Sequence, residues 1–238
     1  MLVTPSPFDG ALLVDKPGGM TSHDVVDRVR RHFGIKKVGH CGTLDPAATG
    51  LLVIVLGKGT KLSEQLMSSD KVYSGRMRLG ETTDSYDADG ELVGSLPVPP
   101  LTLEALNELA ATFTGDLMQT PPMVSAVKVK GIPLHKLARQ GLEVEREARL
   151  IHVYTFRITS YTEPDAEFRI ACTKGTYVRS LAHDLGQKIG CGAHLTSLRR
   201  LDSGRFSVAD ATPLEALLAL TPEALAARVI PFHRLLAA

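Results

Sequence analysis

The sequence predicts an α+β fold, in which strands and helices are mixed without regular βαβ alternation. Short apolar runs such as "GALLVD" at 10–15 and "LLVIVLG" at 51–57 have the length of buried strands. Between them, apolar residues recur at helical spacing, as in "TSHDVVDRVRRHFG" at 21–34. A hydrophobic content of 44% in 238 residues is enough for a sizeable core. No apolar run approaches the roughly 20 residues that would cross a bilayer.

Each element follows from a local pattern. In the helix at 21–34, Thr21 or Ser22 can cap the start, Gly34 can end it, and the valines recur on one face. The strand at 71–80 alternates, with Tyr73 and Met77 on one face and charged residues on the other. The other predicted elements are strands at 10–15, 51–56, 151–160 and 167–173, and helices at 62–67, 102–112, 176–190 and 213–228.

Charge distribution is more informative than the net charge, which is only +1. The stretches 28–40, 128–139 and 188–205 lean basic, whereas 81–91 carries acidic charges alone. A neutral total can therefore hide a basic face that binds nucleic acid, although charges scattered over a solvated surface would give the same total.

The cysteines and the N-terminus bear on the compartment. Cys41, Cys172 and Cys191 are an odd number without paired spacing, which favours reduced thiols over a disulfide framework. No basic start followed by a long apolar stretch marks a signal peptide. We therefore expect a cytoplasmic protein.

Metal and cofactor motifs are incomplete. Cys191 and His194 resemble half of a zinc site, but no second pair of ligands follows. The segment "DSYDADG" at 84–90 resembles the start of a calcium loop, but its last ligand position falls on Leu96. The phosphate-binding, dinucleotide-binding and Gly-x-Ser-x-Gly motifs do not occur. The sequence predicts neither a metal nor a cofactor.

One carboxylate stands out in "GHCGTLDPAATG" at 39–50. Asp45 precedes a proline, which favours an extended backbone, and lies between Gly42 and Gly50, which permit unusual turns and close approach of a ligand. Tyr73 offers a flat face, and Arg179 lies at the start of a helix, where it could pair with a carboxylate. A surface aspartate, a core tyrosine and a surface ion pair are the alternative interpretations.

Five segments together resemble the bacterial TruB family of tRNA pseudouridine synthases, which isomerise uridine 55 in the T-loop. They are "DKPGGMTS" at 15–22, "GHCGTLDPAATG" at 39–50, "KVYSGRMRLGETTDSYDADG" at 71–90, "PPMVSAVKVKG" at 121–131 and "KGTYVRSLAHDLGQKIGCGAHLTSLRRL" at 174–201. The resemblance implies a pseudouridine-synthase fold, with a mixed or antiparallel central sheet flanked by helices and a thumb-like insertion. It also implies an isomerase that uses no cofactor.

The resemblance implies a role for each matching residue. Asp45 would be the catalytic aspartate, Arg179 its partner, and Tyr73 the aromatic residue stacked on the target base. His40 resembles the histidine that takes the place of the flipped base. Tyr177 and Leu198 are similar to further contacts to the target nucleotide, and Lys16 and Pro17 to a structural motif beneath the site.

The resemblance also implies an organisation and a partner. Residues 1–212 would form the catalytic domain, with the thumb-like insertion at 122–149, and 213–238 a short helical segment. We expect the family's usual C-terminal RNA-binding domain to be absent or truncated, and tRNA binding to be more salt-sensitive as a result. The expected partner is the T-arm of tRNA, bound by a monomer that needs neither a protein partner nor a membrane. A non-catalytic tRNA-binding chaperone, or a synthase for another RNA, is the alternative.

Overall fold

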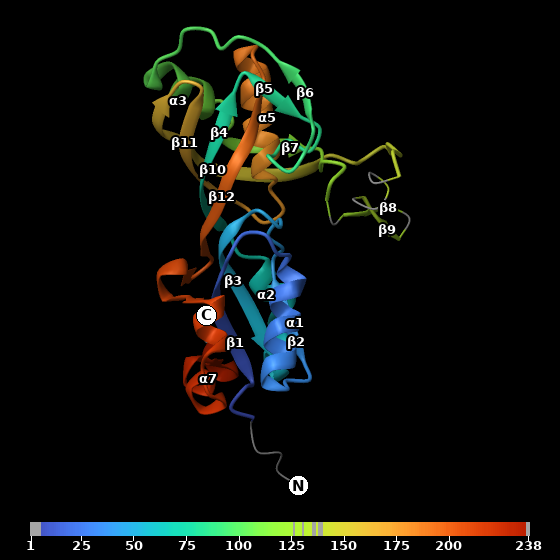
Figure 1. The fold of residues 1–238 in the computed structure, drawn as a ribbon, viewed down its shortest axis with the longest axis vertical. Coiled ribbons are helices and arrows are strands. Elements are labelled where there is room, and N and C mark those ends of the chain that lie inside the picture. Colours follow the sequence, from blue (N-terminus) through green and yellow to red (C-terminus); the bar gives the residue numbers. More distant parts are fainter. Residues whose placement is uncertain (1–5, 126, 130, 135–136, 138–139, 237–238) are drawn as a thin grey trace. The chain divides into compact units, whose positions relative to one another are not determined.

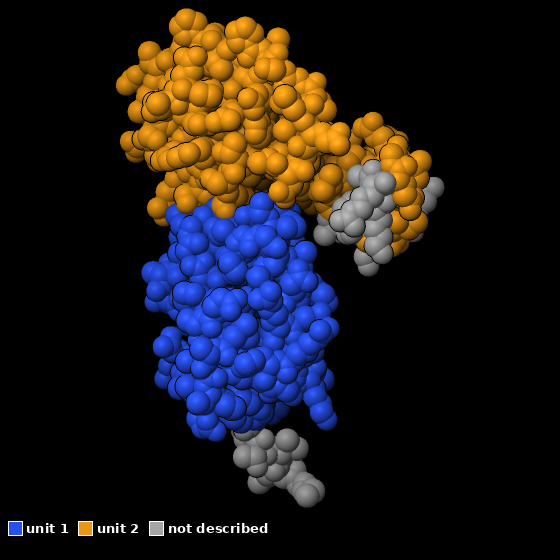
Figure 2. Space-filling view, viewed as in Figure 1, with its two compact units in different colours: residues 1–73, 199–238 blue, residues 74–198 orange. Residues whose placement is uncertain are grey.

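The computed structural model describes residues 6–125, 127–129, 131–134, 137 and 140–236. The chain divides into two compact units: unit 1 comprises 1–73 and 199–238, and unit 2 comprises 74–198 (Figure 2). The boundaries fall inside two strands, β4 (Lys71–Leu79) and β12 (Ala193–Ser203).

Unit 1 is built on a mixed sheet (Figure 1). Strand β1 (Gly10–Lys16) runs antiparallel to β3 (Thr49–Leu56) over its whole length and parallel to the short β14 (Thr212–Pro213). On its other side, β3 pairs with β2 (Val38–Cys41) and runs parallel to β12 at Arg199 and Arg200. Nearly every side chain of β3 is buried, as expected for the continuous apolar run at 51–56.

Helix α1 (Ser22–Phe33) forms where the sequence predicts it. Thr21 and Asp24 form a capping box, and Gly34 closes the helix at φ 64°. Its buried valines pack with side chains of β1 and β3 in one core cluster. The other elements of unit 1 are η1 (Gly57–Leu62), α2 (Ser63–Met67), β13 (Phe206–Ser207), η2 (Val208–Asp210), α6 (Leu214–Leu218), α7 (Pro222–Arg228), β15 (Ile230–Pro231) and α8 (Phe232–Leu236).

Unit 2 has the strand order β12, β4, β11, β10, β7. The hairpin of β10 (Arg149–Thr162) and β11 (Asp165–Cys172) is antiparallel, and β7 (Gly115–Gln119) pairs antiparallel with β10. Helix α3 (Leu103–Ala111) is tied to β10 because the Asn107 amide bonds both backbone groups of Ile158 at 3.0 Å. The remaining elements are α5 (Val178–Ile189) and the hairpins β5 (Glu81–Thr83) with β6 (Leu92–Ser95) and β8 (Lys128–Val129) with β9 (Ile132–Pro133).

The observed elements confirm the predicted α+β class with a mixed sheet. On β4 the predicted inner face is buried, with Tyr73, Met77 and Leu79 at most 9% exposed. Strands β2, β7 and β12 were not predicted from the sequence. The middle of β12, "TSLRR", is polar and charged, so it lacks the alternation that marks a half-buried strand.

Two predictions concern larger pieces of the chain. The insertion predicted at 122–149 contains the β8–β9 hairpin, whereas its residues 126, 130, 135–136 and 138–139 lie outside the described residues. The predicted boundary near 212 does not coincide with the two compact units, and the domain assignment stays a prediction. Among the described residues, no helix is long and apolar enough to cross a membrane.

Candidate catalytic site

Asp45 lies between β2 and β3. We call residues 42–50, which include the first two residues of β3, the Asp45 loop. The two strands pair antiparallel as far as Cys41 and Val53, so the ends of the loop are held close together. Gly42 and Gly50 have φ angles of 93° and 99°, where a side chain would be strained. Asp45 itself is half-buried, and its carbonyl accepts a 3.1 Å hydrogen bond from the Ala48 N–H.

Both neighbours of Asp45 are fixed from outside the loop. The buried Ser22 hydroxyl, at the start of α1, accepts from the Leu44 N–H at 2.8 Å and donates to the Leu44 carbonyl at 3.2 Å. The Pro46 carbonyl accepts from the Gly19 N–H at 2.9 Å and from Lys16 Nζ at 3.0 Å. The backbone on either side of the carboxylate is therefore immobilised by hydrogen bonds to the β1–α1 region.

Lys16 is the most deeply buried cation of the site, with no exposed surface. Its ammonium also donates to the carbonyls of Pro17 at 2.9 Å and Met20 at 2.7 Å. Burial lowers the pKa of Lys16 to about 8, and the negative charge of Asp45 opposes this shift. The ammonium thus joins the β1–α1 connection to the Asp45 loop.

Unit 1 also contains His40 and Tyr73. His40 lies on β2, half-buried, and its Nδ1 has no hydrogen-bond partner among the residues that the structure describes. Burial, followed by the nearby charge of Arg200, lowers the pKa of His40, so its ring is neutral at pH 7. Tyr73 lies on β4 and is 9% exposed.

A second cluster lies in unit 2 at the start of α5. The Gln119 amide fixes Tyr177 by accepting from its N–H at 2.8 Å and donating to its carbonyl at 3.1 Å. The Arg179 side chain, 4% exposed, donates to Asp87 Oδ2 at 3.0 Å and to the carbonyl of Val124. Asp87 in turn accepts from the Ser85 hydroxyl and, at 3.2 Å, from the Asp89 N–H.

The structure therefore groups the predicted residues in two sets. Lys16, His40, Asp45 and Tyr73 belong to unit 1, and Tyr177, Arg179 and Leu198 to unit 2. Arg179 forms a described ion pair with Asp87, and its predicted pairing with Asp45 stays a prediction. The same holds for the individual roles of the other residues.

Three contributors were missed by sequence reasoning. Ser22 was considered only as a helix cap, Asp87 was one of several acids in an acidic turn, and Arg200 was one of two adjacent arginines. No local pattern marks any of them. Ser22 and Arg200 act on partners that are distant in the sequence, and Asp87 cannot be told apart from the acidic residues around it. In the described part of the chain, no group of three or more His, Cys, Asp or Glu side chains is placed to hold a metal ion.

Family models match nearly the whole chain. A model described as the TruB family pseudouridylate synthase N-terminal domain matches residues 30–178, which include His40, Asp45 and Tyr73. The chain belongs to the TruB family. A second TruB-family model, described as the tRNA pseudouridylate synthase B C-terminal domain, matches residues 179–237, beginning at Arg179.

Similar proteins agree with membership of the TruB family. A tRNA pseudouridine synthase B from Opitutus terrae is 54% identical over 227 residues, covering 95% of this chain and 94% of the relative. One from Syntrophotalea carbinolica is 48% identical and covers 91% of this chain and 71% of the relative. A chain in the crystal structure of a Cbf5–Nop10–Gar1 complex superposes with a TM-score of 0.75 at 28% identity. The match covers 96% of this chain and 61% of that one, so this chain spans about three fifths of its length.

TruB-family membership confirms the predicted pseudouridine-synthase fold and the predicted enzyme class. The chain is an RNA pseudouridine synthase, an isomerase of the intramolecular transferase kind. The alternative of a non-catalytic chaperone is not favoured by these comparisons.

Proposed function

We propose that the protein isomerises the uridine at position 55 of the tRNA T-loop to pseudouridine, with Asp45 as the catalytic carboxylate. The observation that supports this most is the Asp45 loop. Its backbone is fixed on both sides of the carboxylate by Ser22 and Lys16, and it lies within the matched family model. Such fixation is what a catalytic group needs, because its geometry must be set before the substrate arrives.

The proposed chemistry is an internal exchange of bonds. The target base leaves its stack and enters the site, where an aromatic side chain such as Tyr73 can hold it. The N1–C1′ glycosidic bond breaks, the uracil turns, a C5–C1′ bond forms, C5 loses its proton and N1 gains one. Asp45 would either attack covalently or stabilise the sugar cation. Substrate and product are isomers, so no redox partner is needed.

Release of the C5 hydrogen provides a direct assay. An unmodified tRNA transcript tritiated at uracil C5 is mixed with the wild-type protein, with Asp45→Asn, and with Asp27→Asn as a matched control. Asp27 is a carboxylate of α1 that pairs with Arg30 on the same helix. We expect tritium release from the wild type and Asp27→Asn, no release from Asp45→Asn, and tRNA binding by all three.

The alternatives give different results in the same assay. Full activity of Asp45→Asn would contradict the assigned role of the carboxylate. Tritium release from a ribosomal RNA transcript, but not from tRNA, would indicate a synthase for another RNA. Bound tRNA without release from the wild type would contradict the enzymatic proposal and favour a chaperone.

The partner and the setting follow from the same proposal. We infer that the T-arm of tRNA is the substrate and that the protein acts as a monomer in the cytoplasm. Cys41, Cys172 and Cys191 are buried and form no disulfide among the described residues, which supports a reducing compartment. A single complex of one protein with one tRNA in sedimentation or light scattering would support the monomer, and a complex containing two proteins would contradict it.

A further inference from the structure

Arg200 is a fully buried arginine on β12, with 1% of its surface exposed. Its Nε donates to the Leu51 carbonyl at 2.7 Å, and its Nη2 donates to the Gly42 carbonyl at 3.1 Å. In the described part of the chain no salt bridge is found for it, and its described hydrogen bonds go to backbone carbonyls. Burying a guanidinium without an acidic partner is costly, and an apolar side chain would fill the same space more cheaply.

The position of Arg200 indicates why a buried guanidinium is used here in spite of its desolvation cost. Its side chain holds the first residue of the Asp45 loop through the Gly42 carbonyl. Its backbone lies against the last residue, since β12 and β3 pair in register at Arg200 and Gly50. A Cβ on Gly50 would lie 2.3 Å from the Arg200 carbonyl oxygen, and a Cβ on Gly42 would lie 3.4 Å from its Nη1. One residue therefore contacts both ends of the loop. The close contact at Gly50 leaves no room for a side chain, whereas at Gly42 it is the φ of 93° that favours glycine.

The other two anchors, Ser22 and Lys16, act elsewhere on the loop. Ser22 holds Leu44 and Lys16 holds Pro46, so they fix the middle of the loop. Neither side chain has a described hydrogen bond to Gly42 or Gly50, although the backbone of Lys16 pairs with Gly50 in the β1–β3 ladder. Arg200 adds a side-chain hydrogen bond at Gly42, where the loop leaves β2, and a backbone contact at Gly50, where it enters β3.

We propose that Arg200 is a positioning residue for the reaction, which clamps both ends of the Asp45 loop and thereby sets the place of the Asp45 carboxylate. The proposal rests on the proposed function, in which Asp45 is the catalytic group. Arg200 touches no reacting atom in this scheme and acts through the loop.

Two substitutions separate geometry from charge. Arg200→Met keeps the length of the side chain but removes both hydrogen bonds, and Arg200→Lys keeps the charge but cannot reach two carbonyls in the same fork geometry. In the tritium-release assay we expect kcat to fall about 10²-fold in both variants, because small misplacement of a catalytic group has effects of this size. The Kd for tRNA should stay within about threefold, since the loop orients the carboxylate rather than the RNA.

Leu225→Ala provides the matched control for lost stability. Leu225 lies on α7 and is fully buried in the core cluster of unit 1, away from the hydrogen bonds of the Asp45 loop. This variant should unfold at a lower temperature but retain wild-type kcat at a temperature where it is folded. An equal loss of kcat in Leu225→Ala would reduce the role of Arg200 to general stability and overturn the proposal.

Hydrogen exchange of the free proteins gives a readout that needs no substrate. Amides of residues 42–50 should exchange faster in Arg200→Met than in the wild type, and at the wild-type rate in Leu225→Ala. If the wild type releases no tritium, the proposed function fails, whereas faster exchange would still show the clamp. Unchanged exchange, or wild-type kcat in either Arg200 variant, would contradict the clamp itself. If Arg200→Met does not fold, Arg200→Lys decides by the same two criteria.

The pKa of His40 helps to separate the effect of the Arg200 charge from the effect of its geometry. The positive charge of Arg200 contributes to the lowered pKa of His40, after burial. Arg200→Met should therefore raise the His40 pKa, and Arg200→Lys should raise it less, as followed by NMR of the imidazole ring. A low kcat in both variants, together with different His40 titrations, would assign the catalytic loss to geometry. A kcat that follows the His40 pKa instead would contradict positioning.

Discussion

The buried ammonium of Lys16 makes stability depend on pH above neutrality. Its pKa is about 8 in the folded protein, below the ordinary value of 10.5, chiefly because of burial. Between these two values the unfolded chain binds more protons than the folded one, so this group lets stability rise with pH. The rise is at most about 1.4 kcal/mol per pH unit. Below the folded pKa the burial penalty is complete, and above the unfolded pKa it has vanished.

Urea unfolding of the wild type and Lys16→Met across this pH window measures the effect. The free energy of unfolding of the wild type, minus that of Lys16→Met, should increase as the pH increases. All other titrating groups are common to both proteins and cancel in this difference. Parallel pH profiles would show that the ammonium of Lys16 is not perturbed by burial.

The ion pair of Arg179 with Asp87 gives a second prediction at the residue scale. Asp87→Asn removes a described acidic partner of the Arg179 guanidinium, which is 4% exposed. Removing one partner of a buried pair typically costs about 3–5 kcal/mol of unfolding free energy, and we expect a loss of that order in urea denaturation. Asp165→Asn is the control, because its partner Arg78 is 40% exposed and a solvated pair contributes little. Equal losses in the two variants would contradict the importance of burial.

Residues of the site differ in how far the sequence reveals them. Asp45 could be found because its glycines, its proline and the following apolar strand are contiguous in the chain. Ser22 and Arg200 could not, since their partners Leu44 and Gly42 are 22 and 158 positions away. Sequence motifs identify the group that reacts, whereas the residues that hold it depend on tertiary pairing.

At the scale of elements, strand glycines separate packing from chain flexibility. A Cβ on Gly75 of β4 would lie 2.6 Å from both the Phe168 ring and the Ser197 carbonyl. A Cβ on Gly94 of β6 would meet its nearest neighbour, Thr82, at 4.0 Å. Gly75→Ala should therefore lose about 1–3 kcal/mol of unfolding free energy through overpacking, whereas Gly94→Ala should be neutral or slightly stabilising.

Thermal or urea unfolding of both glycine variants tests this difference. Circular dichroism is sufficient, because each variant adds a single methyl group to a strand. Equal stability of the two variants would mean that β4 and β11 can separate to admit a methyl group, contrary to the close approach of Phe168.

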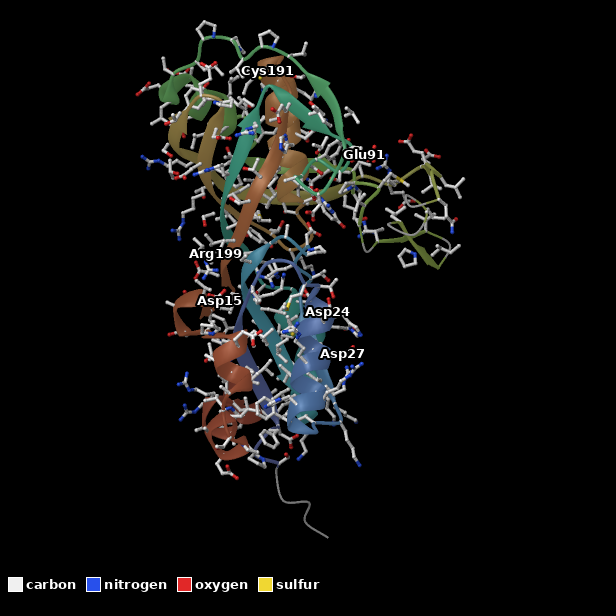
Figure 3. The ribbon with its side chains drawn as sticks, in the orientation of Figure 1. Asp15, Asp24, Asp27, Glu91, Cys191 and Arg199 are labelled. Carbon is white, nitrogen blue, oxygen red and sulfur yellow. The ribbon has the colours of Figure 1, made fainter. Side chains whose placement is uncertain are left out.

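Elements were predictable where their pattern was local. Helix α1 has its cap, its apolar face and its terminal glycine within 14 residues, 21–34, and formed as predicted. Strand β12 was missed because Arg199 and Arg200 interrupt its apolar pattern. The structure satisfies both from outside the strand: Arg199 forms a bidentate pair with Asp15 at 2.6 and 3.0 Å (Figure 3), and Arg200 bonds two carbonyls. Tertiary partners outweigh strand propensity here.

At the scale of the whole molecule, the chain order hides the organisation. Unit 1 joins residues 1–73 to 199–238, and its strands β3 and β12 meet where Thr49 pairs with Arg199. No composition change marks this division, because the boundaries fall within β4 and β12 rather than in a linker rich in Pro or Gly. The α+β class was predictable from periodicity, whereas the discontinuous unit depends on long-range strand pairing.

The three cysteines can report whether the two units unfold together. Cys41 belongs to unit 1, Cys172 and Cys191 belong to unit 2, and each is at most 2% exposed. Burial raises the pKa of the Cys41 thiol to about 11, which lowers its reactivity further. In the native protein we expect no thiol to react rapidly with a disulfide reagent.

Because β4 and β12 continue from one unit into the other, unfolding of either unit removes part of a strand that the other needs. Pulse labelling along a urea titration, with the labelled peptides identified by mass spectrometry, should therefore give one midpoint for all three cysteines. A Cys41→Ala variant assigns the unit 1 signal, and an earlier midpoint for Cys41 than for the other two would show that unit 1 unfolds independently.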